Sequence, residues 1–169
     1  MINKHDLALS RQGHVHSGGR RLYFAYGSNM DSAQMGLRCA EAFVVGLACL
    51  HDFRFITNQG GVATLIPWQK SMVYGVVWSL SGKNEEALDR YEGVEGGLYA
   101  KIEIAVMGAN DTPLQVMLYL ASDTKPGCAI RKYMLRIITA ATALRFPLDY
   151  QLELVGWLRK DAASMSWLK

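Results

Sequence analysis

Glu92 is a carboxylate whose place in the sequence suits proton transfer. It follows a segment with helical periodicity, Lys83 to Tyr91, and three of the next five residues are glycine. A helix C-terminus carries negative partial charge, which disfavours an ionised carboxyl and raises its pKa, more so if the group is buried. Such a carboxyl suits a general base acting on an amine near neutral pH. The alternative is a solvated loop glutamate, and nearby Glu95 is a competitor that we expect to be more exposed.

A second candidate is the run from Tyr23 to Met30, with the sequence Tyr-Phe-Ala-Tyr-Gly-Ser-Asn-Met. Residues with strand propensity lead into Gly27-Ser28-Asn29, which is turn chemistry. Backbone N–H groups at such a strand end can hold a carboxylate or a developing oxyanion. The sequence lacks the GxxxxGK[ST] and GxGxxG patterns, which excludes a phosphate-binding loop or dinucleotide fingerprint of those types. A turn with no further role remains the alternative from these residues alone.

The cysteines do not indicate a redox or metal centre. Cys39, Cys49 and Cys128 lie far apart and show no CxxC spacing. We expect free thiols in a reducing cytosol. Cys49 and His51 would share one face of a strand, but nothing around them suggests an activated cysteine. No metal ligand set and no cofactor is predicted.

The elements that must position Glu92 and the turn can be assigned from hydrophobic periodicity. Strand character is found in Leu22–Tyr26, Phe43–Leu50, Phe53–Thr57, Val62–Ile66, Val73–Leu80, Tyr99–Met107 and Leu114–Leu120. A break is expected near His51-Asp52, and Pro67 is expected to end Val62–Ile66; with the segment from Phe43 to Thr57 counted as one interrupted strand, the total is roughly six strands. Helices are expected at Asp31–Leu37, Lys83–Tyr91, Ile130–Leu144 and Leu148–Lys160. Gly75 within a strand indicates a bulge or a close approach of another group to the backbone. Short turns join consecutive strands, so the predicted class is α+β with a largely antiparallel sheet.

Length and charge limit the classes of function. The chain has 169 residues and a formal net charge of +3, typical of one globular domain and no reason to invoke nucleic acid or an anionic membrane. We expect a flexible polar arm at residues 1–20 and a single domain at 21–169. The arm lacks the apolar centre of a signal peptide, and no apolar stretch is long enough for a transmembrane helix, so a cytoplasmic protein is expected.

Taken together, these segments closely resemble the gamma-glutamylcyclotransferase family. The resemblance rests on the Tyr23–Met30 run and on Leu88–Tyr99, which contains Glu-Gly-Val. It extends to Gly61–Leu65, Val73–Trp78 and the Pro-Leu-Asp-Tyr of Pro147–Tyr150. Together the matching segments span the chain from about Leu22 to Trp157.

The resemblance implies a fold, a reaction and a set of site residues. The fold would be a small mixed barrel with flanking helices, and the reaction would be cyclisation of a gamma-glutamyl group to 5-oxoproline with release of an amine. Glu92 would be the general base. The implied substrate-binding residues are Tyr26, Gly27, Ser28, Asn29, Met30, Tyr99 and Tyr133. The partner would be a small gamma-glutamyl molecule, with no metal, cofactor, nucleic acid or membrane, and the protein would be a monomer or homodimer.

Three functions remain open from the sequence. The leaving group could be an amino acid or peptide, or a specialised amine such as an antibiotic, a polyamine or the side-chain amine of lysine. A non-catalytic member that binds a carboxylate ligand or a protein partner is the third. The short loop Asn58–Gly61 would leave the pocket open to bulky leaving amines.

Overall fold

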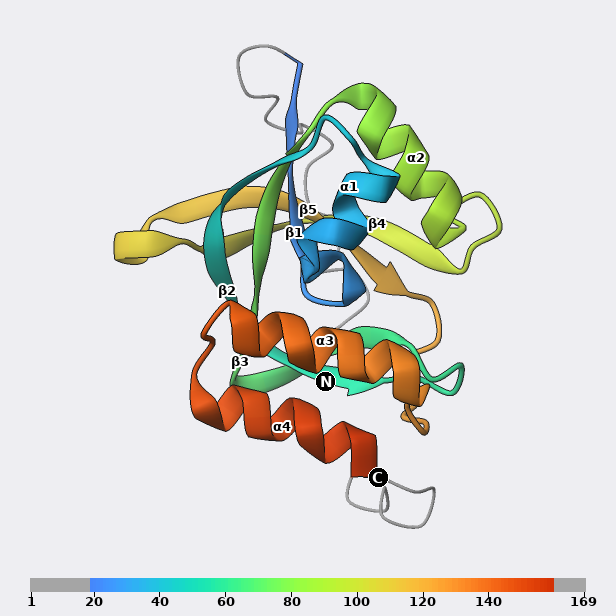
Figure 1. Cartoon of the computed structure of the whole chain (residues 1–169), viewed down its shortest axis with the longest axis vertical. Coiled ribbons are helices and arrows are strands. Elements are labelled where there is room, and N and C mark those ends of the chain that lie inside the picture. Colours follow the sequence, from blue (N-terminus) through green and yellow to red (C-terminus); the bar gives the residue numbers. More distant parts are fainter. Residues whose placement is uncertain (1–18, 160–169) are drawn as a thin grey trace.

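Five strands close into a barrel in the computed structural model, which describes residues 19–159 (Figure 1). The strands are β1 (Arg21–Ala25), β2 (Phe43–Thr57), β3 (Ala63–Leu80), β4 (Tyr99–Met107) and β5 (Pro113–Ala121). Their order around the barrel is β1-β3-β2-β4-β5. The contact between β1 and β5 that closes the barrel is parallel, whereas the other four contacts are antiparallel. The predicted α+β class, a small mixed and largely antiparallel barrel, is therefore confirmed.

The predicted count of roughly six strands is wrong, because β2 and β3 run through the expected breaks. The register between them shifts between His51 and Phe53, and Asp52 there has a positive φ of 59°. Pro67 pairs with Phe53 beside this irregularity, where proline's missing N–H is tolerated. The carboxylate of Asp52 accepts the backbone N–H of Lys70 at 2.9 Å. Strand pairing continues on both sides of this bulge. The four predicted segments therefore form two long strands.

The four predicted helices are present, with ends shifted by a residue or so. They are α1 (Ser32–Arg38), α2 (Gly82–Glu92), α3 (Arg131–Ala143) and α4 (Leu148–Arg159), and two short 3₁₀ turns, η1 (Ser28–Met30) and η2 (Ala109–Asp111), complete the elements. Asp31 caps α1 by accepting the N–H of Ala33 at 2.9 Å. Lys160, the predicted end of the last helix, lies outside the described residues.

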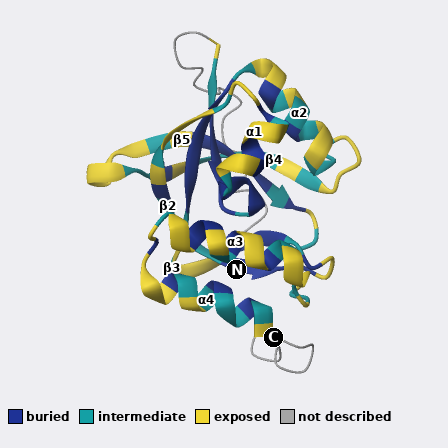
Figure 2. Ribbon diagram, viewed as in Figure 1, coloured by how far each residue is buried: buried dark blue, intermediate teal, exposed yellow. Residues whose placement is uncertain are grey.

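Helices α3 and α4 lie side by side against the hairpin of β2 and β3 (Figure 1). The ring of Tyr74 on β3 packs against that of Tyr150 on α4, with centroids 5.1 Å apart. Arg54 on β2 forms an ion pair with Glu153 on α4 at 2.8 Å. The inner faces of both helices are buried and their outer faces are exposed (Figure 2), as their 3.6-residue periodicity predicts. This packing fixes α3, and with it Tyr133, over one end of the barrel.

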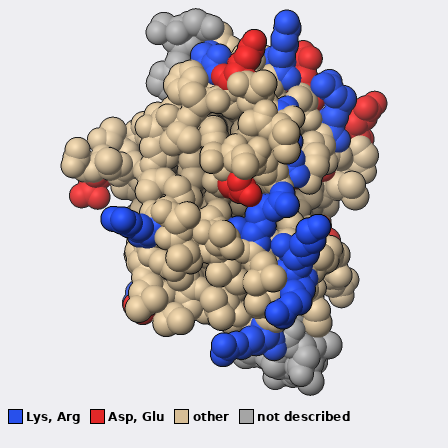
Figure 3. All heavy atoms as spheres, viewed as in Figure 1, with Lys and Arg blue, Asp and Glu red and all other residues tan. Residues whose placement is uncertain are grey.

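The surface of the protein is basic around α3. Arg131, Lys132 and Arg136 all lie on α3. Figure 3 shows Lys and Arg side chains gathered on the right of the face in view, where the N-terminal end of α3 lies in Figure 1. Among residues 19–159, no helix is both long and apolar enough to cross a membrane. Most of the predicted arm, residues 1–18, lies outside the described residues. The division into an arm and a domain therefore stays a prediction.

Candidate active site

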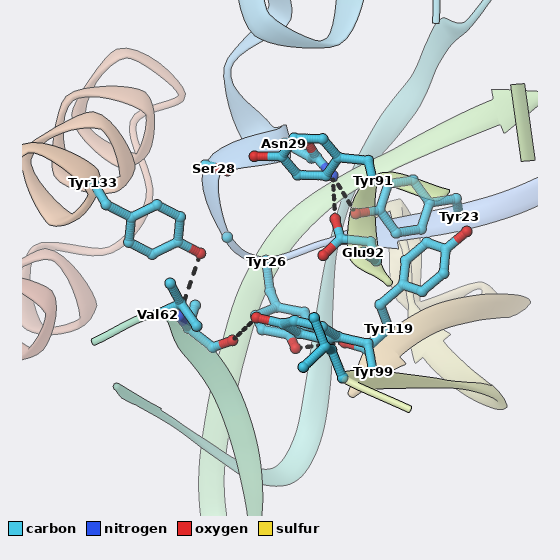
Figure 4. A pocket seen from close by; sticks show the side chains of 13 residues that line it. Tyr23, Tyr26, Ser28, Asn29, Val62, Tyr91, Glu92, Tyr99, Tyr119 and Tyr133 are labelled. Atoms are coloured by element: carbon cyan, nitrogen blue, oxygen red, sulfur yellow. Dashed lines mark hydrogen bonds between the residues drawn. The ribbon is translucent and has the colours of Figure 1, made fainter. Parts of the chain in front are cut away.

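A cavity of about 210 Å³ lies where β1, η1, α2, β4, β5 and α3 meet (Figure 4). It is lined by Tyr23, Tyr26, Gly27, Ser28, Asn29, Val62, Ala63, Tyr91, Glu92, Leu98, Tyr99, Tyr119 and Tyr133. Seven of the eight residues implied by the resemblance belong to this lining. Segments that are distant in the sequence are thus brought to one cavity.

The turn after β1 presents Gly27, Ser28 and Asn29 to the cavity. It is closed by two backbone hydrogen bonds, from the N–H of Met30 to the carbonyl of Gly27 at 3.0 Å and from that of Asp31 to the carbonyl of Ser28 at 3.2 Å. A Cβ on Gly27 would lie 3.1 Å from the hydroxyl of Tyr133, which is tighter than about nine in ten real Cβ contacts. The glycine thus lets the turn lie close to α3.

Met30 is the exception among the predicted site residues. It does not line this cavity, and its N–H is already used to close the turn. Its side chain is only 3 % exposed and lines a different hollow, together with Val76, Trp78 and Ala140. Side chains of successive turn residues point in different directions, so Met30 faces away from Asn29.

Glu92 is the last residue of α2, and the helix ends there because Gly93 adopts a left-handed conformation with φ 65° and ψ 39°. Ser81 and Asn84 form a capping box at the other end of the helix. Lys101 on β4 holds Asp89 of α2 at 2.8 Å, which ties the helix to the barrel. Backbone geometry and ion pairing therefore point Glu92 into the cavity.

The pKa of Glu92 is raised to about 7, chiefly by burial, while the charge of Arg38 and a hydrogen bond from Asn29 act in the opposite direction. The side-chain NH₂ of Asn29 donates to Oε1 of Glu92 at 3.2 Å and to the hydroxyl of Tyr23 at 2.9 Å. Burial is thus the largest cause of the raised pKa that the sequence predicted from the helix end. A carboxyl with this pKa can both accept and donate a proton near neutral pH.

Six tyrosines make up much of the cavity wall (Figure 4). The hydroxyl of Tyr133 accepts the N–H of Ala63, and that of Tyr99 donates to the carbonyl of Ala63, each at 3.3 Å. Burial is the largest cause of the raised pKa values of Tyr99 and Tyr133, so both stay neutral at neutral pH. Among the lining residues, Glu92 is the single Asp, Glu, Lys, Arg or His. The cavity thus offers one proton-transferring group within a neutral wall of hydroxyl and aromatic groups.

Several lining residues were not among the predicted site residues, although some of them lie beside a predicted one in the sequence. Tyr91 and Leu98 directly precede Glu92 and Tyr99 in the sequence, and Tyr23 lies in β1, the strand that leads into the predicted turn. Tyr119 had no local signal, because it enters the site from β5 only through the closure of the barrel.

The predicted competitors of this site lie elsewhere. Glu95 is exposed and does not line the cavity. Cys49 and His51 do share a face, with Sγ and Nε2 3.6 Å apart, but they lie outside the cavity, and burial raises the pKa of the thiol. A raised pKa opposes formation of the thiolate nucleophile. The three cysteines are free, as predicted, and residues 19–159 contain no cluster of three or more His, Cys, Asp or Glu side chains suited to a metal.

Known proteins resemble this chain over most of the described fold. Residues 72–154 match the AIG2-like family. A human protein named gamma-glutamylcyclotransferase is 32% identical over 77% of this chain and 74% of its own length. A mouse protein of the same name is 31% identical over 83% of this chain and 80% of its own length.

Solved structures also resemble this protein. One titled gamma-glutamyl cyclotransferase superposes with a TM-score of 0.75 at 30% identity, covering 80% of this chain and 86% of the other. The Bacillus subtilis protein YkqA shares the fold, with a TM-score of 0.72 at 20% identity over 85% of this chain and 56% of its own.

Proposed function

Because the chain belongs to the gamma-glutamylcyclotransferase family and is an enzyme of that type, we propose that Glu92 is its general acid and base. The substrate in this proposal is a gamma-glutamyl amine or gamma-glutamyl amino acid, and the products are 5-oxoproline and the free amine. The observation that carries the proposal is the placement of one carboxyl with a pKa near 7 in a cavity whose other lining residues are neutral.

The reaction needs only the substrate's own atoms and a group that moves protons. The α-ammonium gives a proton to Glu92, and the free α-amine then attacks the γ-carbonyl carbon to close a five-membered ring. The bond from that carbon to the leaving nitrogen breaks, and the carbonyl re-forms, as Glu92 returns its proton to this nitrogen. The ring nitrogen gives its remaining extra proton to the released amine, so that the products are 5-oxoproline and the amine in its ammonium form. Since the nucleophile is tethered to the electrophile, its effective concentration can reach about 10⁵ M or more. Acid and base catalysis by Glu92 would add about 10²–10⁴ in rate.

The turn after β1 is the proposed holder of the glutamyl group. Tyr26, Gly27, Ser28 and Asn29 line the cavity where the turn lies beside α3, and their polar groups are suited to a carboxylate or an oxyanion. Tyr99 and Tyr133 are the proposed contacts on the other walls of the site. Met30 serves instead by closing the turn through its N–H.

Release of 5-oxoproline tests the proposed function directly. The purified protein is incubated with gamma-glutamyl-alanine and with a set of gamma-glutamyl amines, and 5-oxoproline is measured by chromatography. Activity on at least one substrate that Glu92→Gln abolishes supports the proposal. Lack of release from every substrate, or equal release by the variant, would contradict it.

The pH dependence of the reaction follows from the state of Glu92. The group must be ionised to accept the proton, and its pKa is raised to about 7. We therefore expect kcat/KM to fall on the acid side of about pH 7, by about tenfold for each further pH unit. A profile from pH 5 to 8 measures this limb, and a rate that stays flat down to pH 5 would argue against Glu92 as the base.

The rim of the cavity favours an uncharged leaving group. Tyr91 and Leu98 are 56% and 67% exposed and form the outer part of the lining. Among residues 19–159, no cationic side chain lines the cavity to pair with a second carboxylate, and burying part of a charge without a partner is unfavourable. We expect kcat/KM for gamma-glutamyl-phenethylamine to exceed that for gamma-glutamyl-phenylalanine by roughly fivefold.

These two substrates differ only by the carboxylate on the leaving group, so each is the control for the other. The opposite ranking would indicate that this carboxylate reaches a cation outside the lining, and the expectation would then be wrong.

A further inference from the structure

Asn29 is held at both ends of its side-chain amide. Its Oδ1 accepts hydrogen bonds from Arg38 and, at 3.4 Å, from Gln34, both on α1. Arginine has only donors, so the atom of Asn29 that faces it must be the oxygen. The NH₂ group is thereby directed to the opposite side, where it donates to Tyr23 and Glu92. The orientation of the amide toward Glu92 is thus set from outside the cavity.

Arg38 contacts two residues that line the cavity, Asn29 and Tyr91. It is the last residue of α1 and is partly buried. Its guanidinium carbon lies 3.3 Å from the centroid of the Tyr91 ring, a cation–π contact. Tyr91 immediately precedes Glu92 in α2, whereas Asn29 belongs to the turn after β1. One side chain therefore bridges the two segments on which the proposed mechanism depends.

Gln34 and Arg136 support the same turn. Arg136 on α3 donates to Oε1 of Gln34, which directs the NH₂ of Gln34 to the hydroxyl of Ser28 at 2.8 Å. Residues outside the cavity lining thus orient the side chains of both Ser28 and Asn29, and Arg38 is the one that also contacts α2.

We propose that Arg38 is a positioning residue for Glu92, acting through Asn29 and Tyr91 and through its own positive charge. This inference rests on the proposed function, in which Glu92 moves the proton. Arg38 itself touches no reacting atom, and nothing in the sequence analysis singled it out.

Arg38 is the charged side chain with the largest effect on the pKa of Glu92. The titratable side chains facing the carboxyl are Tyr23 from β1, Tyr26 after it, Tyr99 from β4 and Tyr133 from α3. Their pKa values are all raised, so they are neutral at neutral pH. The positive charge of Arg38 holds the pKa of Glu92 below the value that burial alone would give. Removing that charge raises the pKa further, and the base is then ionised only at higher pH.

The experiment compares Arg38→Gln with Arg38→Lys, which keeps the positive charge and a hydrogen-bond donor group but loses the planar guanidinium. In Arg38→Gln we expect kcat at pH 7 to fall about tenfold, with the acid limb of the profile moved to higher pH and KM changed by less than about twofold. The deficit should be larger at pH 6 than at pH 9, and Arg38→Lys should restore most of the shift of the limb. Arg90→Gln is the matched control, since Arg90 is exposed on α2 and does not line the cavity.

A second readout does not depend on turnover. In protein labelled with ¹³C at the glutamate carboxyls, the titration of Glu92 should move to higher pH in Arg38→Gln and stay in place in Arg90→Gln. An unchanged titration of Glu92 in folded Arg38→Gln would overturn the inference even if activity fell. A shifted titration in a protein with no cyclotransferase activity would instead overturn the proposed function and leave the contact between Arg38 and Glu92 standing.

Discussion

Glu92→Gln is expected to lower kcat by about 10²–10⁴, the usual contribution of a positioned acid and base. Glutamine preserves the shape of the side chain but cannot accept a proton. Glu92 faces Asn29 in the cavity, and in the part of the chain that the structure describes no other Asp, Glu, Lys, Arg or His lines it to take over the role. Turnover of gamma-glutamyl substrates at pH 7 measures the effect.

The same variant should not be less stable than the wild type. The folded pKa of Glu92, about 7, lies above its ordinary value of 4.5, so its contribution to stability is full below pH 4.5 and is lost as the pH rises through 7. At pH 8 the wild type buries a charge that glutamine does not carry. We expect Glu92→Gln to gain about 1–3 kcal/mol in free energy of unfolding at pH 8, and nothing at pH 4. Urea unfolding at the two pH values measures the difference.

Glu95→Gln is the matched control for Glu92→Gln. It removes a carboxylate three residues away that is exposed and outside the cavity. We expect its turnover to stay within about twofold of the wild type, since surface substitutions of this kind have small effects. If Glu95→Gln lost activity and Glu92→Gln kept it, the assignment of the base would be reversed.

Gly75→Ala is expected to destabilise the protein by about 3 kcal/mol or more, because it overpacks the contact between two strands. A Cβ at Gly75 would lie 2.4 Å from the carbonyl oxygen of Ala25 and 2.7 Å from the ring of Phe24. Both neighbours belong to β1, and Phe24 is fully buried, so neither can move away at low cost. Chemical denaturation measures the loss.

The substitution should also damage the site in the molecules that stay folded. β1 ends at Ala25 and leads directly into the turn that carries Gly27–Asn29, so a displaced β1 moves that turn. Gly46→Ala is the control, since a Cβ at this glycine of β2 meets nothing within 4 Å. We expect Gly46→Ala to change stability by less than about 1 kcal/mol. Equal stability of the two variants would show that β1 yields more easily than its burial suggests.

Local signals in the sequence were sufficient for most elements and for half of the site. Periodicity located all four helices and the faces they bury, and Gly93, the first of the three glycines after Glu92, ends α2 in a left-handed conformation. Gly75 was expected to mark a bulge or a close approach to the backbone. The close approach is confirmed, whereas the register of β2 and β3 is regular at that position. The motifs around Asn29 and Glu92 identified the family, since each depends on a few neighbouring residues.

Other features depended on contacts that local signals do not contain. Break signals at His51-Asp52 and Pro67 suggested four segments, but pairing across the bulge joined them into two long strands. The side chain of Met30 left the site because the 3₁₀ turn directs it to another hollow. A single sequence cannot show which partner a strand finds or which way a turn residue points.

The sequence by itself therefore determined the family, the elements, and Glu92 and the Gly27–Asn29 turn as the two halves of the candidate site. The tertiary structure decided that Glu92 would be buried enough to raise its pKa to about 7. It also decided that Tyr119 would enter the cavity and that Arg38 would bridge Asn29 and Tyr91. The physical reason is range: propensity and turn chemistry act between neighbours in the chain, whereas burial, charge and amide orientation depend on groups that meet only when the barrel closes.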